Sequence, residues 1–237
     1  MEKVIYVAWR REDESQDDLR DRLLGPLTDT LLTRNIHGLQ INAADSDVAD
    51  AMIRVATLEP QMDAVISVWI DTAMDAAREP IDTLVHDATG AMAAYLVTES
   101  VPLANTTRVA TRRRRTDGFA NIAFLRRPDR FTHAQWLAAW QNGQTPVAIA
   151  TQSTFGYTQN VVVRALTGGA PHFDGIVEEL FPREALTDLH AFFASGGDDE
   201  KLNAHMTAMN ESTAAFGATE TIDVLPTSQY VIVTPFA

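Results

Sequence analysis

A carboxylate and an imidazole in the last third of the chain are the side chains best suited to proton transfer. Glu178 lies in the predicted strand Phe173–Phe181, in an alternating set of residues that starts at Asp174. If this set faces a closed chamber, burial raises the pKa of Glu178 and suits it to general acid/base catalysis. His172 stands beside Asp174 as a second acid/base candidate. We therefore predict Glu178 and His172 as catalytic residues. The alternatives are that Glu178 is a carboxylate at the solvated rim of the chamber and that His172 only marks the start of a strand.

Polar residues on the other predicted strands are candidates for holding a substrate. Wholly apolar alternating sets are expected to pack under helices, which leaves Tyr6 and Asn121 facing the chamber, although the sequence leaves open which set faces inward. Tyr157, Asn160 and Gln144 can each hold a carbonyl or hydroxyl group by hydrogen bonding. The predicted substrate-binding residues are Tyr6, Asn121, Gln144, Tyr157, Asn160 and Asp174.

The motifs that mark metal and cofactor sites are missing from the sequence. None of the six histidines forms an H-E-x-x-H or H-x₃-H pair, and the chain has no cysteine. There is no P-loop, no G-x-G-x-x-G run and no G-x-S-x-G elbow. We therefore expect neither a metal nor a cofactor.

The elements that position these residues recur twice along the chain. Val4–Arg11 and Asn121–Arg127 are both apolar strands that end in two arginines. Ser15–Asp18 and Thr132–Gln135 follow as matching capping boxes, and each helix then meets a Gly/Pro interruption. With the later strands, each half has the order β-α-β-β-α-β, which is typical of a ferredoxin-like unit. The predicted units are residues 1–105, an Arg-rich linker at 106–117, and residues 118–237 with an extra helix at about 198–216.

Two such halves need a partner for the bare faces of their sheets. An antiparallel sheet with helices on one side exposes its other face, and pressing two sheets together covers both. We therefore predict an α+β fold in which two ferredoxin-like halves in tandem form an intramolecular dimeric α/β barrel. The space between the sheets is a natural small-molecule pocket.

Four stretches of the second half resemble the EthD family of small dimeric α+β barrel proteins; they are Leu125–Pro128, Phe131–Trp140, Tyr157–Asn160 and Asp174–Phe181. The resemblance implies a tandem fusion that imitates the family's dimer. It also implies chemistry such as accessory roles in ether degradation, or dehydratase and decarboxylase-like steps on aromatic polyketide-type substrates. Family members usually carry a histidine two residues before a proline. Here Gln144 precedes Pro146 and Leu24 precedes Pro26, and glutamine cannot shuttle a proton at neutral pH.

We therefore predict an EthD-like, cofactor-independent enzyme that uses acid/base chemistry (dehydratase, cyclase or decarboxylase type) on an apolar aromatic or polyketide-like carbonyl compound. The alternatives are a non-catalytic ligand-binding or degenerate barrel and, third, a cofactor-free monooxygenase. The expected partner is an apolar small molecule, and the protein is expected to be a monomer or a homodimer of tandem barrels.

Composition and charge argue against other partners. The net charge of −13 argues against binding to nucleic acid, despite the run Arg112–Arg115, which we expect to be a solvated linker paired with the acids at Glu12–Asp18. No membrane span or signal peptide is visible, so we expect a cytoplasmic location.

Overall fold

A computed structural model of the protein describes residues 1–110 and 113–235. Its strands close into an antiparallel barrel in the order β1-β3-β2-β8-β5-β7-β6-β4. This confirms the predicted α+β barrel. The strands are β1 (Glu2–Trp9), β2 (Ile36–Ala43), β3 (Ala64–Ile70), β4 (Ala91–Leu103), β5 (Phe119–Leu125), β6 (Gly156–Ala165), β7 (Gly175–Phe181) and β8 (Ile222–Val233).

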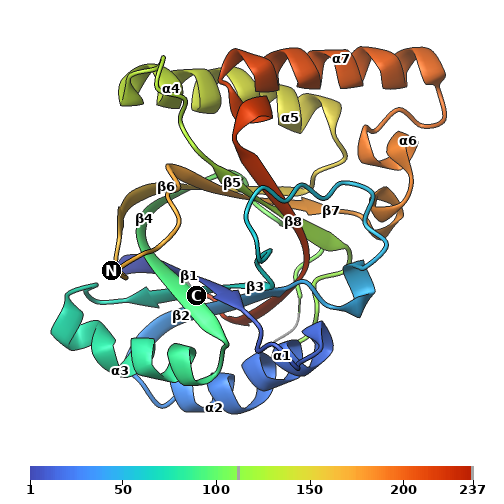
Figure 1. Ribbon diagram of the computed structural model, residues 1–237. Coiled ribbons are helices and arrows are strands. Elements are labelled where there is room, and N and C mark those ends of the chain that lie inside the picture. The colour runs from blue at the N-terminus through green and yellow to red at the C-terminus, as the bar shows by residue number, and fades with distance from the viewer. Residues whose placement is uncertain (111–112, 236–237) are drawn as a thin grey trace.

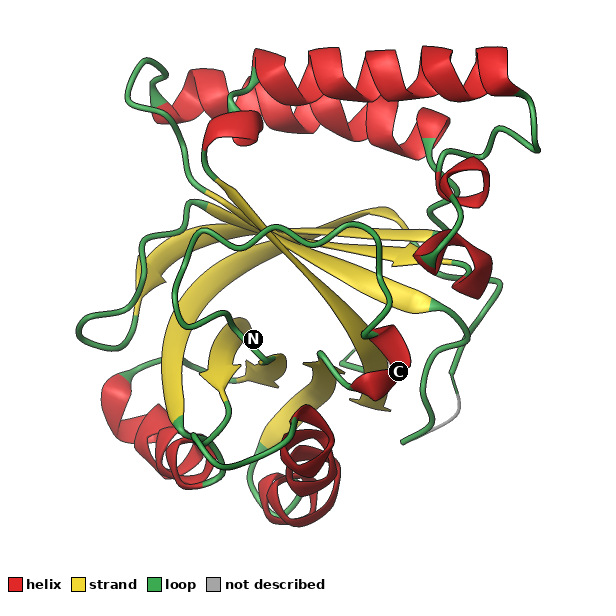
Figure 2. Ribbon diagram, turned by 45° about the vertical axis from the view of Figure 1, so that its right-hand side comes forward, coloured by secondary structure: helices red, strands yellow, loops and turns green. Residues whose placement is uncertain are grey.

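Helices cover the barrel on two opposite sides, so that the molecule is layered as helix, sheet, sheet and helix (Figures 1 and 2). The helices α1 to α3 pack on the strands of the first half, and α4 to α7 on those of the second (Figure 1). None of the helices in the described ranges is long and apolar enough to cross a membrane. The α-helices are α1 (Gln16–Arg22), α2 (Thr28–Leu31), α3 (Asp75–Asp87), α4 (His133–Ala138), α5 (Thr145–Thr151), α6 (Leu189–Phe192) and α7 (Asp199–Ala215).

Both predicted capping boxes are confirmed at the starts of α1 and α4. The Ser15 hydroxyl accepts a hydrogen bond from the backbone N–H of Asp18, and the Thr132 hydroxyl accepts one from Gln135. Each helix then widens into a π-helical turn, at Leu23–Leu27 and at Ala139–Gln144, where the Gly/Pro interruptions were expected. The same local chemistry therefore produces the same irregular helix in both halves.

The two halves of the barrel have the same strand order. In the first half the neighbours run β4-β1-β3-β2, and in the second the equivalent strands run β8-β5-β7-β6. The halves join where β2 pairs with β8 and where β4 pairs with β6, antiparallel in both cases. The strand β8 begins at Ile222, and its first part, residues 222–227, pairs with residues 120–125 of β5.

Alternation along each strand divides the core into an inner cluster inside the barrel and clusters under the helices. In β1, Ile5 and Val7 belong to the inner cluster, whereas Tyr6 packs with the leucines of the helices. The prediction that Tyr6 faces the chamber is therefore wrong. Its ring is buried under the helices because its hydroxyl finds a partner there, donating to Asp82 of α3 at 2.8 Å.

The segment between β2 and β3 closes one end of the barrel. Val55 forms a β-bridge with Val224 at the start of β8, and Leu58 and Met62 pack against the inner apolar cluster. The Thr57 hydroxyl donates to the Asp223 carboxylate at 2.9 Å. We call this segment, residues 44–63, the strap.

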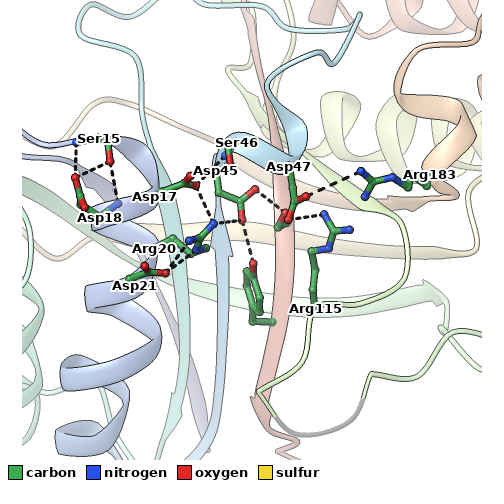
Figure 3. A network of polar contacts seen from close by, with 12 residues as sticks. Ser15, Asp17, Asp18, Arg20, Asp21, Asp45, Ser46, Asp47, Arg115 and Arg183 are labelled. Atoms are coloured by element: carbon green, nitrogen blue, oxygen red, sulfur yellow. Dashed lines mark hydrogen bonds and ion pairs between the residues drawn. The ribbon is translucent and has the colours of Figure 1, made fainter.

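A polar network joins the first half to the second beside the strap (Figure 3). Asp45 is fully buried and accepts hydrogen bonds from Ser228 and Tyr230 of β8 at 2.8 and 3.0 Å. Arg115 pairs with Asp47 at 3.1 Å, and Arg113 pairs with Asp29 at 2.6 Å.

The arginines of the linker therefore find acids other than the predicted ones at Glu12–Asp18, because tertiary packing brings acids from elsewhere to them. Arg112 lies outside the described residues.

Candidate functional site

Glu178 lies on the inner face of the barrel, in the alternating set that was predicted to contain it. Its carboxylate accepts hydrogen bonds from three side-chain amides: Gln40 Nε2 at 2.9 and 3.0 Å, Asn42 Nδ2 at 2.8 Å and Gln229 Nε2 at 2.7 Å. These hydrogen bonds fix the position of the carboxylate. A carboxylate held in this way is suited to recognise a ligand.

The other predicted residues of the second half do not gather around Glu178. Asn160 shares the inner face, where its amide donates to the carbonyl of Ile176 at 3.1 Å. His172 is 76% exposed and contacts Asp174 at 3.0 Å. The Asp174 carboxylate also accepts from the backbone N–H of Arg127 at 2.7 Å. The catalytic role of His172 stays a prediction.

Asn121 and Tyr157 lie on the opposite, helix-covered face of the second half. Asn121 pairs with Glu179 across β5 and β7, and Tyr157 pairs with Glu179 across β6 and β7. Cross-strand neighbours project their side chains to the same face within about 5 Å. The prediction that Asn121 faces the chamber is therefore wrong, because Asn121 and its strand neighbours Ala123 and Leu125 lie beneath the helices.

Glu179 is the central group of this row and was not predicted from the sequence. It lies deep under the helices, although part of its side chain retains accessible surface. No hydrogen bond or ion pair to Glu179 exists within the part of the chain that the structure describes. Burial alone raises its pKa to about 7 from an ordinary value of 4.5. Near neutral pH, Glu179 therefore exists in both protonation states.

The surroundings of Glu179 are aromatic and contain buried polar atoms without partners. Trp136, Trp140 and Tyr157 form one cluster with Val177. Among the described residues, the indole Nε1 atoms of both tryptophans and Oδ1 of Asn121 are buried without a hydrogen-bond partner. Unpaired buried donors and acceptors are costly and uncommon, so their presence together on one face is an unusual feature of the core.

Tyr157 and Gln144 complete the helix-covered face in different ways. Burial, reinforced by the nearby Glu179 charge, raises the pKa of Tyr157 well above its ordinary value, so its hydroxyl stays protonated. Gln144 is held by α7: its Oε1 accepts from the Ser212 hydroxyl, and its Nε2 contacts Met209 Sδ at 3.3 Å. Gln144 therefore orients the helix packing, and only the row Asn121, Glu179 and Tyr157 meets at one place.

A signal for Glu179 was present in the sequence. The second alternating set of Phe173–Phe181 contains Gly175, Val177 and Glu179, a glycine and an apolar residue followed by a charge. That pattern predicts a helix-covered face, where a carboxylate is desolvated. Gly175 is needed there because a Cβ at this position would meet Trp140 Cη2 at 2.8 Å.

No group of three or more acidic or histidine side chains suited to hold a metal ion occurs in the described ranges.

Comparison with known proteins supports the fold and leaves the function open. No family model matches the sequence, and no curated protein matches it. Among solved structures, an anthrone oxidase-like protein superposes with a TM-score of 0.51 at 10% identity, covering 100% of this chain and 95% of that one.

Two further structures cover similar shares of the chain. A candidate monooxygenase from Lactobacillus acidophilus NCFM superposes with a TM-score of 0.49 at 12% identity, covering 98% of this chain and 95% of that one. A candidate chlorite dismutase gives 0.49 at 10% identity, covering 97% and 95%. Sequence identities this low concern the fold alone. The strand order shows a closed antiparallel barrel, and the first superposition shows that this chain shares its fold with the anthrone oxidase-like protein.

Proposed function

We propose that the protein is a cofactor-independent enzyme that moves a proton on an apolar, aromatic carbonyl compound, with Glu179 as the acid/base group. The observation that carries the proposal is a partly buried carboxyl under the helices, without partners in the described chain, whose pKa of about 7 lies near the usual working pH. The aromatic side chains of Trp136, Trp140 and Tyr157 on the same face suit contact with a flat apolar substrate.

The reaction begins when the Glu179 carboxylate removes a proton from the carbon next to the carbonyl group. Negative charge then develops on the carbonyl oxygen and needs hydrogen-bond donors that are already in place. The unpaired indole N–H groups of Trp136 and Trp140 are such donors, and the unpaired Asn121 Oδ1 can accept from a substrate hydroxyl. Protonated Glu179 then gives its proton to the hydroxyl that leaves in a dehydration, or to the alkoxide that forms in a cyclisation. In a decarboxylation the bond to the leaving carbon dioxide breaks instead of a C–H bond, and the protonated acid gives its proton to the enolate carbon that remains.

Oxygenation is a second candidate function, favoured by the superposition on an anthrone oxidase-like protein. The same proton removal converts an aromatic ketone into an electron-rich enolate that can react with dioxygen. Both candidates fit an EthD-like chain made of two ferredoxin-like halves at residues 1–105 and 118–237, joined by the linker 106–117. The repeated strand order and the paired π-helical turns support that tandem organisation.

The test uses a panel of hydroxylated aromatic ketones, anthrone among them. Binding is followed by tryptophan fluorescence, proton removal by exchange of the carbon-bound hydrogen in D₂O, and oxygenation by oxygen uptake. Glu179→Gln should lower the exchange rate at least about 100-fold with little effect on binding. The matched control Glu184→Gln changes an exposed residue and should leave the rate unchanged.

Each possible outcome separates the candidates. Exchange without oxygen uptake supports the acid/base enzyme, and exchange with uptake supports the oxygenase. Binding without exchange identifies a carrier and contradicts the catalytic role of Glu179, as does full exchange activity in Glu179→Gln.

A further inference from the structure

A pocket opens at the end of the barrel opposite the strap. Its volume is about 290 Å³, near the lower limit of usual small-molecule sites. Glu178, Gln40 and Gln229 contribute its polar wall, and Val101, Leu103 and Val231 contribute apolar wall. This pocket is on the inner face of β7, whereas Glu179 faces the helices.

Glu178 gives the pocket an uncompensated negative charge. Its Oε1 accepts from Gln40, Asn42 and Gln229, whereas its Oε2 accepts only from Gln40. A carboxylate oxygen has two lone pairs, so Oε2 can accept another hydrogen bond. No lysine, arginine or histidine within residues 1–110 and 113–235 forms an ion pair with Glu178.

The amides around Glu178 are fixed before any ligand arrives. The Thr116 hydroxyl donates to Oε1 of Gln229 at 2.6 Å, which turns Nε2 of Gln229 toward the carboxylate. Gln40 Nε2 donates to Oδ1 of Asn42 at 2.9 Å and so orients the Asn42 amide in the same way. Such a network holds the carboxylate in one position, which lowers the entropic cost of recognition.

Lys3 is the one cation that the described residues contribute to the pocket wall, and its charge is already neutralised. The Lys3 ammonium pairs with the Glu99 carboxylate and lies 4.5 Å from the centre of the Trp69 ring. The charges of Lys3, Glu99 and Glu178 therefore sum to −1 inside the barrel mouth. The chain as a whole carries −13, so its field also draws cations and repels anions.

We propose that this pocket binds a small organic cation, an ammonium group on a compact apolar body. The ammonium donates to Oε2 of Glu178 and supplies the missing positive charge. The apolar body lies against Val101, Leu103 and Val231 at the rim. Charge-assisted hydrogen bonds are about twice as strong as neutral ones, so the pocket prefers an amine to an alcohol of the same shape.

The experiment compares three probes of one shape and different charge on the full chain: hexylammonium, hexanol and hexanoate. Binding is measured by the shift of the Trp69 indole N–H signal in NMR titrations and by calorimetry. Hexylammonium should bind at least about tenfold more tightly than hexanol, and hexanoate should not bind. Equal affinity for the ammonium and the alcohol, or no binding of the ammonium, overturns the proposal.

Two variants locate the binding. Glu178→Gln removes the charge and should weaken hexylammonium at least about tenfold; unchanged affinity refutes the assignment. Should that variant fail to fold, Val101→Trp fills the rim and should abolish binding, while Met74→Trp is the matched control on an exposed site outside the pocket. If both tryptophan variants still bind hexylammonium, or if both lose binding, the ligand does not bind in this pocket. Because Glu179 lies on the other face, failure here leaves the proposed catalysis intact.

Discussion

The raised pKa of Glu179 makes a quantitative prediction about stability against pH. In the unfolded chain this carboxyl loses its proton near pH 4.5, whereas in the folded protein it keeps the proton up to about pH 7. Between these values the folded state binds more protons than the unfolded state. The free energy of unfolding therefore falls as the pH rises through this window. The difference in pKa corresponds to about 3 kcal/mol of lost stability above pH 7.

Replacing Glu179 by glutamine removes that dependence, because glutamine resembles the protonated acid and does not titrate. At pH 4.5 the variant should match the native protein in stability. At pH 8 it should be more stable by up to about 3 kcal/mol. Urea unfolding followed by circular dichroism at five values between pH 4.5 and 8.5 gives the free energy at each pH.

The difference between the two proteins is the informative quantity, because other buried acids contribute equally to both. Asp45 is one of these, since burial raises its pKa despite its hydrogen bonds to Ser228 and Tyr230. Glu184→Gln serves as the control and should show no pH-dependent difference. A difference between native and Glu179→Gln protein that stays constant from pH 4.5 to 8.5 would refute the reasoning about burial.

Two further predictions concern packing and the network between the halves. Gly175→Ala should destabilise the protein by about 1–3 kcal/mol, because the added Cβ meets the Trp140 ring at 2.8 Å. At Gly143 nothing lies within 4 Å of an added Cβ, so Gly143→Ala should stabilise the protein by about 0.5–1 kcal/mol. Denaturant midpoints measure both, and equal effects at the two glycines contradict the close approach. Asp45→Ala leaves two buried hydroxyl donors without their acceptor and should lower the free energy of unfolding by about 2–4 kcal/mol. The control Asp87→Ala, at an exposed site, should change it by less than about 0.5 kcal/mol. Similar melting points for the two variants would contradict the structural role of Asp45.

The arrangement of elements could be predicted because local signals repeat. A strand, a capping box and a Gly/Pro interruption occur twice in the same order, starting at Ser15 and at Thr132 for the helices. Each signal acts over only a few residues and survives in any tertiary setting. Each predicted sheet has one face without helices, and a closed barrel covers both of these faces, so the barrel could be predicted as well.

The faces of the strands could be predicted only in part, since alternation defines two sets and says nothing of their direction. Tyr6 was assigned to the chamber because its hydroxyl is polar, yet one hydrogen bond to Asp82 satisfies it beneath a helix. The acids that pair with the linker arginines were likewise missed. Asp29 and Asp47 are far from Arg113 and Arg115 in sequence and meet them only in the folded barrel.

The alternation of side chains along β7 gives Glu178 and Glu179 different chemical environments. Adjacent residues of β7 project to opposite faces, so two identical side chains enter two environments. Inside the barrel, three amides hold Glu178 as a fixed anion, which suits it to bind a cation. Under the helices, Glu179 lies beside Asn121 and Tyr157 and forms no hydrogen bond or ion pair within the described chain, which suits it to carry a proton. Sequence reasoning favoured Glu178 for proton transfer, whereas burial raises the pKa of its neighbour Glu179, which is therefore the acid/base group that we propose.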